Sequence, residues 1–238
     1  MSKFLIIISI ISFTYSQIIE PPSLIWNVST SGSDEIGDGS QMNPFATIQK
    51  AIDEMDNGDL VHVASGTYVE NIICDKSIKI LGAGIDETIV DGGGIDRVFD
   101  ISISGPTLNI SNLTIQNGSG ERKGGGLKFE STGTGQAKLV INECHFYNNH
   151  TVYSVNDGFE DMTGGGAIFI NSNDENIDTI KINNCIFNNN YAVFTQDEFI
   201  DIGYGGAINL WTGVHLKINN SLFINNSAGS LGNSIYKS

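Results

Sequence analysis

The chain has 238 residues, with 12 basic against 27 acidic side chains and a net charge of −15. This negative balance argues against nucleic acids and anionic lipid as partners, and it favours cations or neutral glycans. A chain of this length, rich in Gly and Asn and with only 4 Pro, fits one elongated domain.

Residues 1–16 are predicted to be a secretory signal peptide. One Lys precedes an apolar run from Phe4 to Phe13, and small residues lead to Ser16. This run is too short to span a bilayer comfortably, so cleavage is favoured over anchoring. The mature protein, 17–238, is then secreted to the extracellular space or cell surface, with no membrane insertion after cleavage.

Residues 25–58 are expected to form an N-terminal cap. A short strand, IWNVST, and a loop, GSDEIGDGSQMNP, precede an amphipathic helix in FATIQKAIDEMDNG, which Gly58 can close. A helix laid across the first strands of a sheet covers their apolar core and their free edge. The apolar face of this helix comprises Ile48, Ala51, Ile52 and Met55.

The loop of this cap holds Asp34 and Asp38 among glycines. Hard cations such as Ca²⁺ prefer several flexible oxygen ligands, so a calcium site is one interpretation. The spacing does not match the acidic pattern of an EF-hand, and a solvated turn is the favoured alternative. The sequence indicates no other cofactor.

Strand-like segments fill residues 59–118, among them LVHV, TYVENI, SIKILGAG and TLNISNLTIQNG. His62 stands between apolar neighbours in an alternating strand, so its ring is expected to point outward into solvent. Cys74 has no partner in a matching position and is predicted to be a buried thiol.

A two-part phrase recurs through the second half of the chain. Its parts are a Gly-Gly-Ala-Ile run and an apolar run that ends in Phe-x-Asn-Asn, most complete within residues 164–190. A repeat of this length that tolerates insertions is typical of a stacked solenoid. The other copies are GGGLKF (124–129), KLVINECHFYNN (138–149), GGAINL (205–210) and HLKINNSLFINN (215–226). The aligned positions are Gly125, Gly165 and Gly205, at intervals of 40 (165 − 125 and 205 − 165), and Ile110, Ile141, Ile182 and Ile218.

The runs themselves are strand-sized, end in Asn or Gly pairs, and are too short for a helix. Parallel strands about 4.8 Å apart would place Phe on Phe, and Asn on Asn as a hydrogen-bonded ladder. The sequence therefore predicts an all-β, right-handed parallel β-helix, a single-stranded solenoid with its cap at 25–58 and its coils over 59–238. A leucine-rich repeat is the competing architecture, but its Leu frame is missing.

The GGAI and FxNN phrases, here GGAIF, GGAIN, FYNN, FNNN and FINN, resemble the repeats of chlamydial polymorphic outer-membrane proteins and related β-helix surface proteins. NPFATIQKAIDEMDNGDLVHVASGTYVENI (43–72) is similar to the opening of many secreted pectin-lyase-like β-helix proteins. The two resemblances together span residues 25–236. They imply the fold but not an activity, because this fold carries lyases, hydrolases, esterases and non-catalytic adhesins alike.

Cys144 and Cys185 occupy the same position in adjacent copies, so the fold places them side by side. A secreted protein can form a disulfide, and the spacing of adjacent coils permits one here. Leu113 and Ser221 fill the same column, however, and packed thiols explain the position without a bond. We favour packed thiols.

Two insertions, 150–163 and 191–204, precede the Gly-Gly run in consecutive copies and should emerge from the same corner of neighbouring coils. Aromatic rings stack on sugar faces and carboxylates accept hydrogen bonds from hydroxyls, so this corner is the best candidate surface for an extracellular glycan or surface protein. The alternative is that the rings pack the loops onto the body while the acids stay solvated. The predicted ligand-binding residues are Tyr153, Phe159, Asp161, Phe199 and Asp201.

A polysaccharide-active enzyme, a lyase before a hydrolase or esterase, is the alternative function. A lyase needs an Arg or Lys base and commonly Ca²⁺ held by aspartates. Arg122 and Lys123 are the best candidate catalytic residues, although neither stands in an arrangement resembling the pectate-lyase motifs. The polygalacturonase and pectinesterase motifs are also missing, so the sequence favours a non-catalytic protein.

Several Asn-x-Ser/Thr sequons make the product a candidate glycoprotein. Asn27 and Asn149 are predicted to be the accessible acceptors, whereas Asn225, inside the Asn ladder, is predicted to be buried and unmodified.

The last residues, LGNSIYKS, restart the Gly-Gly-Ala-Ile phrase from Gly232 to Tyr236. No cap is predicted after them, so the last coil should present an open edge, either in a shortened relative of longer surface proteins or for edge-to-edge self-association. The sequence thus predicts a secreted, non-catalytic, adhesin-like surface or matrix protein that binds glycan or protein.

Overall fold

The computed structural model describes residues 24–103, 107–131, 137–152, 164–172, 178–192, 203–211, 214–229 and 231–237. Within them the protein is built of strands, with one short helix, α1 (Ile48–Glu54). The strands are β1 (Ile25–Val28), β2 (Leu60–Val63), β3 (Gly66–Val69), β4 (Ile72–Cys74), β5 (Ile78–Gly82), β6 (Thr88–Asp91), β7 (Phe99–Ile103), β8 (Thr107–Gln116), β9 (Ser119–Glu121), β10 (Leu127–Ser131), β11 (Lys138–Tyr147), β12 (His150–Val152), β13 (Ile168–Ser172), β14 (Asp178–Asn183), β15 (Ile186–Asn188), β16 (Tyr191–Ala192), β17 (Ile208–Leu210), β18 (Val214–Asn219), β19 (Leu222–Ile224), β20 (Ser227–Ala228) and β21 (Ile235–Lys237).

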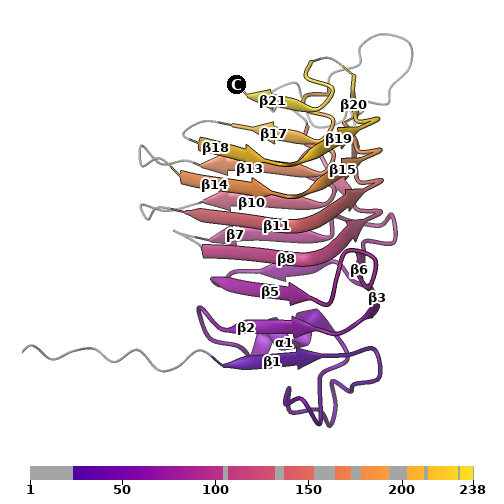
Figure 1. The fold of residues 1–238 in the computed structure, drawn as a ribbon, viewed down its shortest axis with the longest axis vertical. Coiled ribbons are helices and arrows are strands. Elements are labelled where there is room, and N and C mark those ends of the chain that lie inside the picture. Colours follow the sequence, from indigo (N-terminus) through magenta and orange to yellow (C-terminus); the bar gives the residue numbers. More distant parts are fainter. Residues whose placement is uncertain are drawn as a thin grey trace, which may run out of the picture.

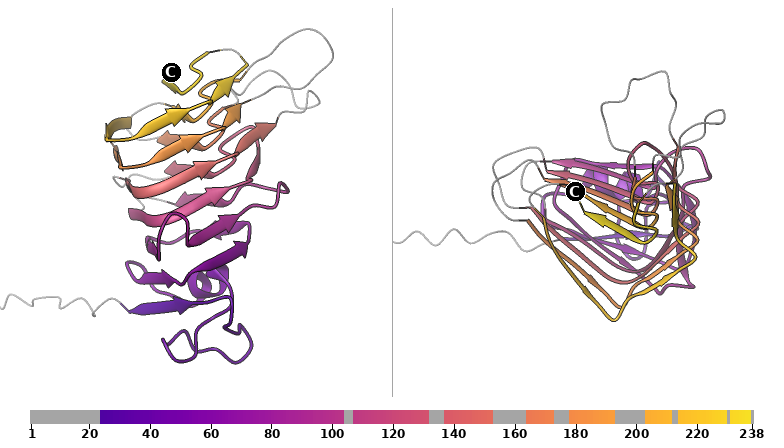
Figure 2. Two further views of the ribbon diagram at one scale, coloured as in Figure 1. Left: turned by 45° about the vertical axis from the view of Figure 1, so that its right-hand side comes forward. Right: turned by 90° about the horizontal axis from the view of Figure 1, so that it is seen from above.

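The described strands form three sheets, of 11, 6 and 4 strands, in which all strand pairs are parallel. From β8 onward each turn of the chain visits the 11-stranded, the four-stranded and the six-stranded sheet in that order. Successive turns therefore lie directly above one another, as Figure 1 and the view from above in Figure 2 show. The prediction of an all-β parallel β-helix is confirmed.

Two bends of the chain, one within the 11-stranded sheet and one between it and the four-stranded sheet, depend on residues that accept a left-handed backbone. In two columns of stacked positions φ lies between 48° and 57°, and all but one of these residues are Asn. Asn tolerates this conformation better than most L-residues, because its short polar side chain bonds locally. The first column is Asn112, Glu143, Asn184 and Asn220; the second is Asn117, Asn148, Asn189 and Asn225.

The register agrees with the alignment of the apolar runs. Ile110 pairs with Ile141, Ile141 with Ile182, and Ile182 with Ile218. The glycine alignment is wrong by one residue in its first copy, because Leu127 pairs with Ile168 and Lys123 bridges to Gly164. The stacked left-handed glycines are consequently Gly124, Gly165, Gly205 and Gly232.

Two stacks run through the interior. The Phe146 and Phe187 rings are parallel with centroids 4.9 Å apart, and Phe187 and Phe223 follow at 4.8 Å. Beside them, Asn149 donates from its backbone N and from Nδ2 to Oδ1 of Asn190, at 3.1 Å each. We call Asn149, Asn190 and Asn226 the inner amide ladder.

The predicted exposure of Asn149 and burial of Asn225 are both wrong. In each Asn pair the first residue takes the left-handed corner and the second turns into the core, so Asn149 is 0% exposed while Asn225 faces solvent. Nδ2 of Asn149 donates to the Ile115 carbonyl at 2.9 Å as well as to Asn190, which leaves no room for a glycan.

Helix α1 covers the first coil, as predicted, with Ile48, Ala51 and Ile52 buried. The helix is held at both ends by side chains from the coil. The Glu70 carboxylate accepts from the first N–H groups, those of Ile48 and Gln49, at 2.9 and 3.0 Å, and Lys76 Nζ donates to three carbonyls at the last turn. These contacts satisfy helix-end groups that would otherwise lack partners.

All three cysteines, Cys74, Cys144 and Cys185, are free and buried. Packed thiols, not a disulfide, therefore fill the column at Cys144 and Cys185. Burial raises the pKa of the Cys144 thiol well above its usual value, and the neighbouring Cys185 adds to this effect. His62 lies exposed on the outer face of β2, as predicted.

The inner amide ladder is expected to hold the coils together. Asn190→Ala should lower the free energy of unfolding by about 3 kcal/mol, because it removes the acceptor of the Asn149 backbone N and Nδ2 and the side-chain donor to the Phe146 carbonyl. Denaturant unfolding followed by circular dichroism measures this. The exposed Asn219, whose Nδ2 donates to Asn183 at 2.8 Å, is the matched control, and Asn219→Ala should cost less than about 1 kcal/mol. Equal losses in both variants would contradict the assignment.

Candidate functional site

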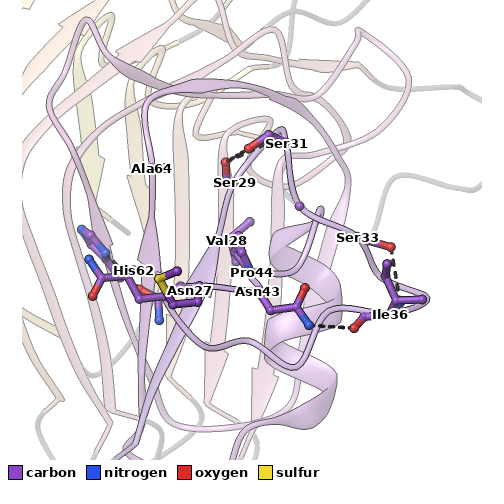
Figure 3. A pocket seen from close by; sticks show the side chains of 13 residues that line it. Asn27, Val28, Ser29, Ser31, Ser33, Ile36, Asn43, Pro44, His62 and Ala64 are labelled. Carbon is purple, nitrogen blue, oxygen red and sulfur yellow. Dashed lines mark hydrogen bonds between the residues drawn. The ribbon is translucent and has the colours of Figure 1, made fainter.

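A pocket of about 530 Å³ lies at the N-terminal end of the β-helix, between the loop that follows β1 and the C-terminal ends of β1 and β2 (Figure 3). Its polar lining comes from hydroxyl, amide and imidazole side chains, and none of the described residues that line it is Asp, Glu, Lys or Arg. The polar side chains are those of Asn27, Ser29, Ser31, Ser33, Gln41, Asn43 and His62.

The loop of the pocket is fixed because it takes the place of a strand beside β1. The backbone N of Asn27 donates to the Gly39 carbonyl at 2.8 Å, and Phe45 N donates to the Asn27 carbonyl at 3.0 Å. The Trp26 and Phe45 rings stack below, with centroids 5.9 Å apart. A Cβ on Gly39 would lie 2.5 Å from the Trp26 ring, so the loop can pass over this stack only with glycine there.

Within the pocket, polar side chains organise the wall. Nδ2 of Asn43 donates to the Ile36 carbonyl at 2.8 Å, and the Ser29 and Ser31 hydroxyls are 2.9 Å apart. Two apolar side chains stand at the rim, Met42 at 93% and Ile36 at 77% exposure. The pocket thus combines a neutral hydrogen-bonding wall with an apolar rim.

Asp34 and Asp38, the candidate calcium ligands, are already engaged. The Asp34 carboxylate accepts from Ala46 N, Thr47 N and the Thr47 hydroxyl, and Asp38 accepts from Ser40 N at 2.9 Å. The Ser40 hydroxyl and, after it, this backbone N–H lower the pKa of Asp38. Asp34 thereby fastens the loop to the start of α1. Among the described residues no group of three or more His, Cys, Asp and Glu side chains is placed to hold a metal ion.

The candidate catalytic residues, Arg122 and Lys123, lie away from this pocket, in the segment before β10 of the six-stranded sheet. Lys123 Nζ is 3.2 Å from the Glu130 carboxylate and lies over the rings of Phe169, at 5.2 Å, and Trp211, at 5.9 Å. Arg122 occupies a left-handed corner with φ 63°, and its backbone N donates to the Val152 carbonyl at 2.9 Å. Lys123 therefore forms a structural contact between coils.

This contact belongs to a row of alternating charges on the outer face of β7 and β10. Lys128 Nζ lies 3.2 Å from Glu130 and 3.1 Å from Asp100. Burial opposes ionisation of Glu130, but the ammonium groups of Lys123 and Lys128 outweigh it and lower the pKa of this carboxyl.

The predicted ligand-binding residues Tyr153, Phe159, Asp161, Phe199 and Asp201 lie outside the described residues, as do residues 1–16. The residues that flank the two insertions are described, and they meet on adjacent coils. His150 pairs with Tyr191, their rings stack with centroids 4.7 Å apart, and Gly164 bridges to Tyr204. The insertions therefore start and end at matching positions, as the sequence predicts.

A second, shallower pocket of about 320 Å³ lies beside this corner. It is lined by Asp91, Gly93, Gly94, Asn117, Asn148 and His150. Asn117 and Gln116 both donate to Asp91 Oδ2 at 2.7 Å, so the carboxylate serves to orient amides. Burial lowers the pKa of His150, which keeps the ring neutral at neutral pH.

A protein family matches part of the chain. The family described as "Protein of unknown function (DUF1565)" matches residues 30–80, and this family is found in β-helix proteins. The matched stretch contains most of the described pocket lining, α1 and the strands β2, β3 and β4. It is less than half of the chain, so the likeness is confined to this part. No curated protein matches the chain.

The pocket was not found by sequence reasoning, which treated the loop only as an acidic turn. Its signal is the combination of Ser, Asn and Gln with Met42 and Ile36 in one loop, opposite an outward His62.

Asn27, a predicted glycosylation site, is only half-exposed, and its Nδ2 donates to the Gly39 carbonyl at 3.1 Å. In the described part of the chain no helix has the length and apolar character needed to cross a bilayer.

The Glu130 contacts predict a pH-dependent contribution to stability. Because the folded-state pKa lies below the usual 4.5, the stabilisation is complete above pH 4.5 and is lost as the pH falls through the folded value. Glu130→Gln should therefore cost about 1–3 kcal/mol at pH 7 and progressively less below pH 4.5. Urea unfolding between pH 7 and pH 3 measures the difference.

A matched control for this experiment is Glu87→Gln. Glu87 is exposed, and its carboxylate accepts from the Ser65 hydroxyl at 2.8 Å. Its substitution should change stability by less than about 0.5 kcal/mol over the whole range. A Glu130→Gln deficit that stays constant from pH 7 to pH 3 would argue against the ionic contacts.

Proposed function

We propose that this protein is a secreted, non-catalytic β-helix protein that binds a neutral glycan in the N-terminal pocket. The observation that carries the proposal is the uncharged lining of that pocket in a chain with a net charge of −15. Hydroxyl and amide side chains donate to and accept from sugar hydroxyls, and the absence of carboxylates and cations from the described lining gives no advantage to a charged ligand.

Rigidity of the pocket supports binding. The loop is fastened by backbone bonds to β1, by the Asp34 contacts and by the Trp26–Phe45 stack. A preformed site loses little conformational entropy when it takes up a ligand. The family match over residues 30–80 falls on the same segment and is consistent with a role for it beyond capping.

A binding role accounts for the described residues better than catalysis does. The described residues of the lining offer one titratable side chain, His62, and include no second acid or base. Lys123, the candidate lyase base, is engaged with Glu130 and two ring faces. The relationship to pectin-lyase-like proteins and to the chlamydial surface proteins is part of the same proposal, as are the signal peptide at 1–16 and the extracellular location.

A panel of neutral and acidic polysaccharides, with and without Ca²⁺, tests the proposal directly. Retention of the protein on neutral glycans, with no unsaturated or reducing-end products and no Ca²⁺ dependence, is the expected result. Product formation would refute the non-catalytic assignment, and retention on acidic glycans alone would refute the ligand class.

Variants locate the binding site. His62→Ala should weaken binding about 2- to 10-fold, the effect of one hydrogen bond. His215→Ala is the matched control, because His215 is also exposed on the outside of a strand but lies in the last coil. Unchanged binding in His62→Ala, together with loss in Phe159→Ala or Phe199→Ala, would move the site to the insertions.

A further inference from the structure

Four exposed lysines of the described chain have ammonium groups that make no ion pair or hydrogen bond with a described residue. They differ in this from Lys50, which pairs with Glu54, and from Lys128, which pairs with Asp100. All four belong to strands of one sheet, the 11-stranded one. They are Lys79 on β5, Lys138 on β11, Lys181 on β14 and Lys217 on β18.

Strand register brings three of these lysines together on the outer face of the sheet. Lys181 pairs directly with Lys217. Lys138 pairs with Thr179, which lies on the same side of β14 as Lys181. The alternate residues of these strands, such as Ile182, point into the core. Figure 1 shows β11, β14 and β18 one above another along this face.

The charge of these lysines is not balanced within the described face. Up to the bend that contains Glu143, the described side chains that point outward from β8, β11, β14 and β18 include no Asp or Glu. The six-stranded sheet differs, since Lys128 there lies 3.2 Å from Glu130. Like charges directly opposite each other on neighbouring strands destabilise a sheet. The pairing of Lys181 with Lys217 therefore costs stability, and a bound anion would offset that cost.

A column of asparagine side chains runs beside the lysines on the same strands. Nδ2 of Asn183 donates to Oδ1 of Asn142 at 2.7 Å, and Nδ2 of Asn219 donates to Oδ1 of Asn183 at 2.8 Å. Each amide nitrogen carries two protons, and each of these bonds uses one. The second protons have no acceptor among the described residues, so they remain for a ligand. We call Lys138, Lys181, Lys217, Asn142, Asn183 and Asn219 the lysine face.

We infer that the lysine face binds an anionic polysaccharide through its sulfate groups. A Lys ammonium is a compact point charge that can approach any oxygen of a tetrahedral sulfate, whereas planar carboxylates are matched best by the two-pronged Arg guanidinium. Neither Arg97 nor Arg122 belongs to this sheet. Sugar hydroxyls between the sulfates accept hydrogen bonds from the remaining amide protons.

The spacing of the cations suits an extended ligand. Adjacent coils lie about 4.8 Å apart, so the three lysines of the face span about 10 Å along the stacking axis. Lys79, on β5 of the same sheet, extends this row of cations to about 19 Å. A linear polymer with regularly placed anions matches such a row better than a single small anion does.

Nucleic acids, the other common polyanions, fit this face less well. They bind open surfaces by stacking bases on aromatic or Arg side chains, and the described residues of the lysine face include neither. The net charge of −15 repels any polyanion at a distance. Screening limits that repulsion to about 8 Å at physiological salt, so a ligand in contact with the face is governed by the lysines.

Three forms of one polymer test the inference on the purified protein: dextran sulfate, carboxymethyl dextran of equal charge density, and uncharged dextran. At about 0.15 M salt dextran sulfate should bind saturably in biolayer interferometry and more weakly as the salt rises. The carboxylated polymer should bind at least about threefold more weakly. No binding of dextran sulfate, equal binding of the two charged polymers, or tighter binding of poly-glutamate would overturn the inference.

Two double variants locate the sulfate site. Lys181→Gln with Lys217→Gln should weaken dextran sulfate binding at least about tenfold, because two charge-assisted contacts are lost. The matched control, Lys50→Gln with Lys237→Gln, removes the same charge from α1 and β21 and should leave the affinity within about twofold. Equal weakening in the two double variants would contradict the assignment to this face. Since Lys181 and Lys217 repel each other, their double variant should resist denaturant at least as well as the unaltered protein.

The same reagents separate this inference from the proposed function. The pocket lies beside β1 and β2, so His62→Ala should leave dextran sulfate binding unchanged. Loss of that binding in His62→Ala would place the sulfate site in the pocket and refute the inference. Retention on neutral glycans should in turn be unchanged in the Lys181 and Lys217 double variant, so failure of either site leaves the other standing.

Discussion

Hydrogen bonding between buried asparagine side chains is what the rest of this structure depends on. A buried amide without partners costs free energy, and Asn149 and Asn190 avoid that cost only when the next coil presents another Asn at the same height. A slip of one residue between coils would leave several such groups unpaired. The ladder therefore fixes the register, and the register in turn aligns the phenylalanine stack and the left-handed corners.

The fixed register also determines which parts of the molecule are available for binding. Coils locked into register give a stiff body, and the segments that differ from one coil to the next are confined to its corners and ends. One end is closed by α1 and its clamps from Glu70 and Lys76, and it carries a neutral pocket. Figure 2 shows the other coils stacked above this end. Binding in this pocket thus leaves the stack itself undisturbed.

Sequence reasoning succeeded where identical or similar residues stack on adjacent coils. The columns headed by Ile110 and Phe146, the helix face of Ile48 and the outward His62 all follow from periodicity or from the repeat. The Asn pairs were assigned the wrong way round, because the choice between the left-handed corner and the core depends on backbone dihedral angles that composition does not reveal. The glycine register failed for a similar reason: three consecutive Gly residues, 124–126, allow two alignments that only strand pairing separates.

The site was harder to predict than the fold. The pocket arises because the loop after β1 lies along that strand, and this depends on bonds such as Asn27 to Gly39 and on the room that Gly39 leaves above Trp26. Neither contact has a sequence signature. Lys123 precedes the glycine turn 124–126 and Glu130 lies within β10, so their pairing depends on how this turn places β10 relative to Lys123.

Hydrogen exchange at the ladder asparagines, resolved by NMR, tests the role of the amide ladder most directly. The backbone N–H groups of Asn149 and Asn190 are bonded in the core and should exchange only through global unfolding, with protection matching the free energy of unfolding. The N–H of Asn226, which has no acceptor among the described residues, should exchange orders of magnitude faster. Exchange of Asn149 and Asn190 as fast as that of Asn226 would show that the ladder does not hold the coils in register.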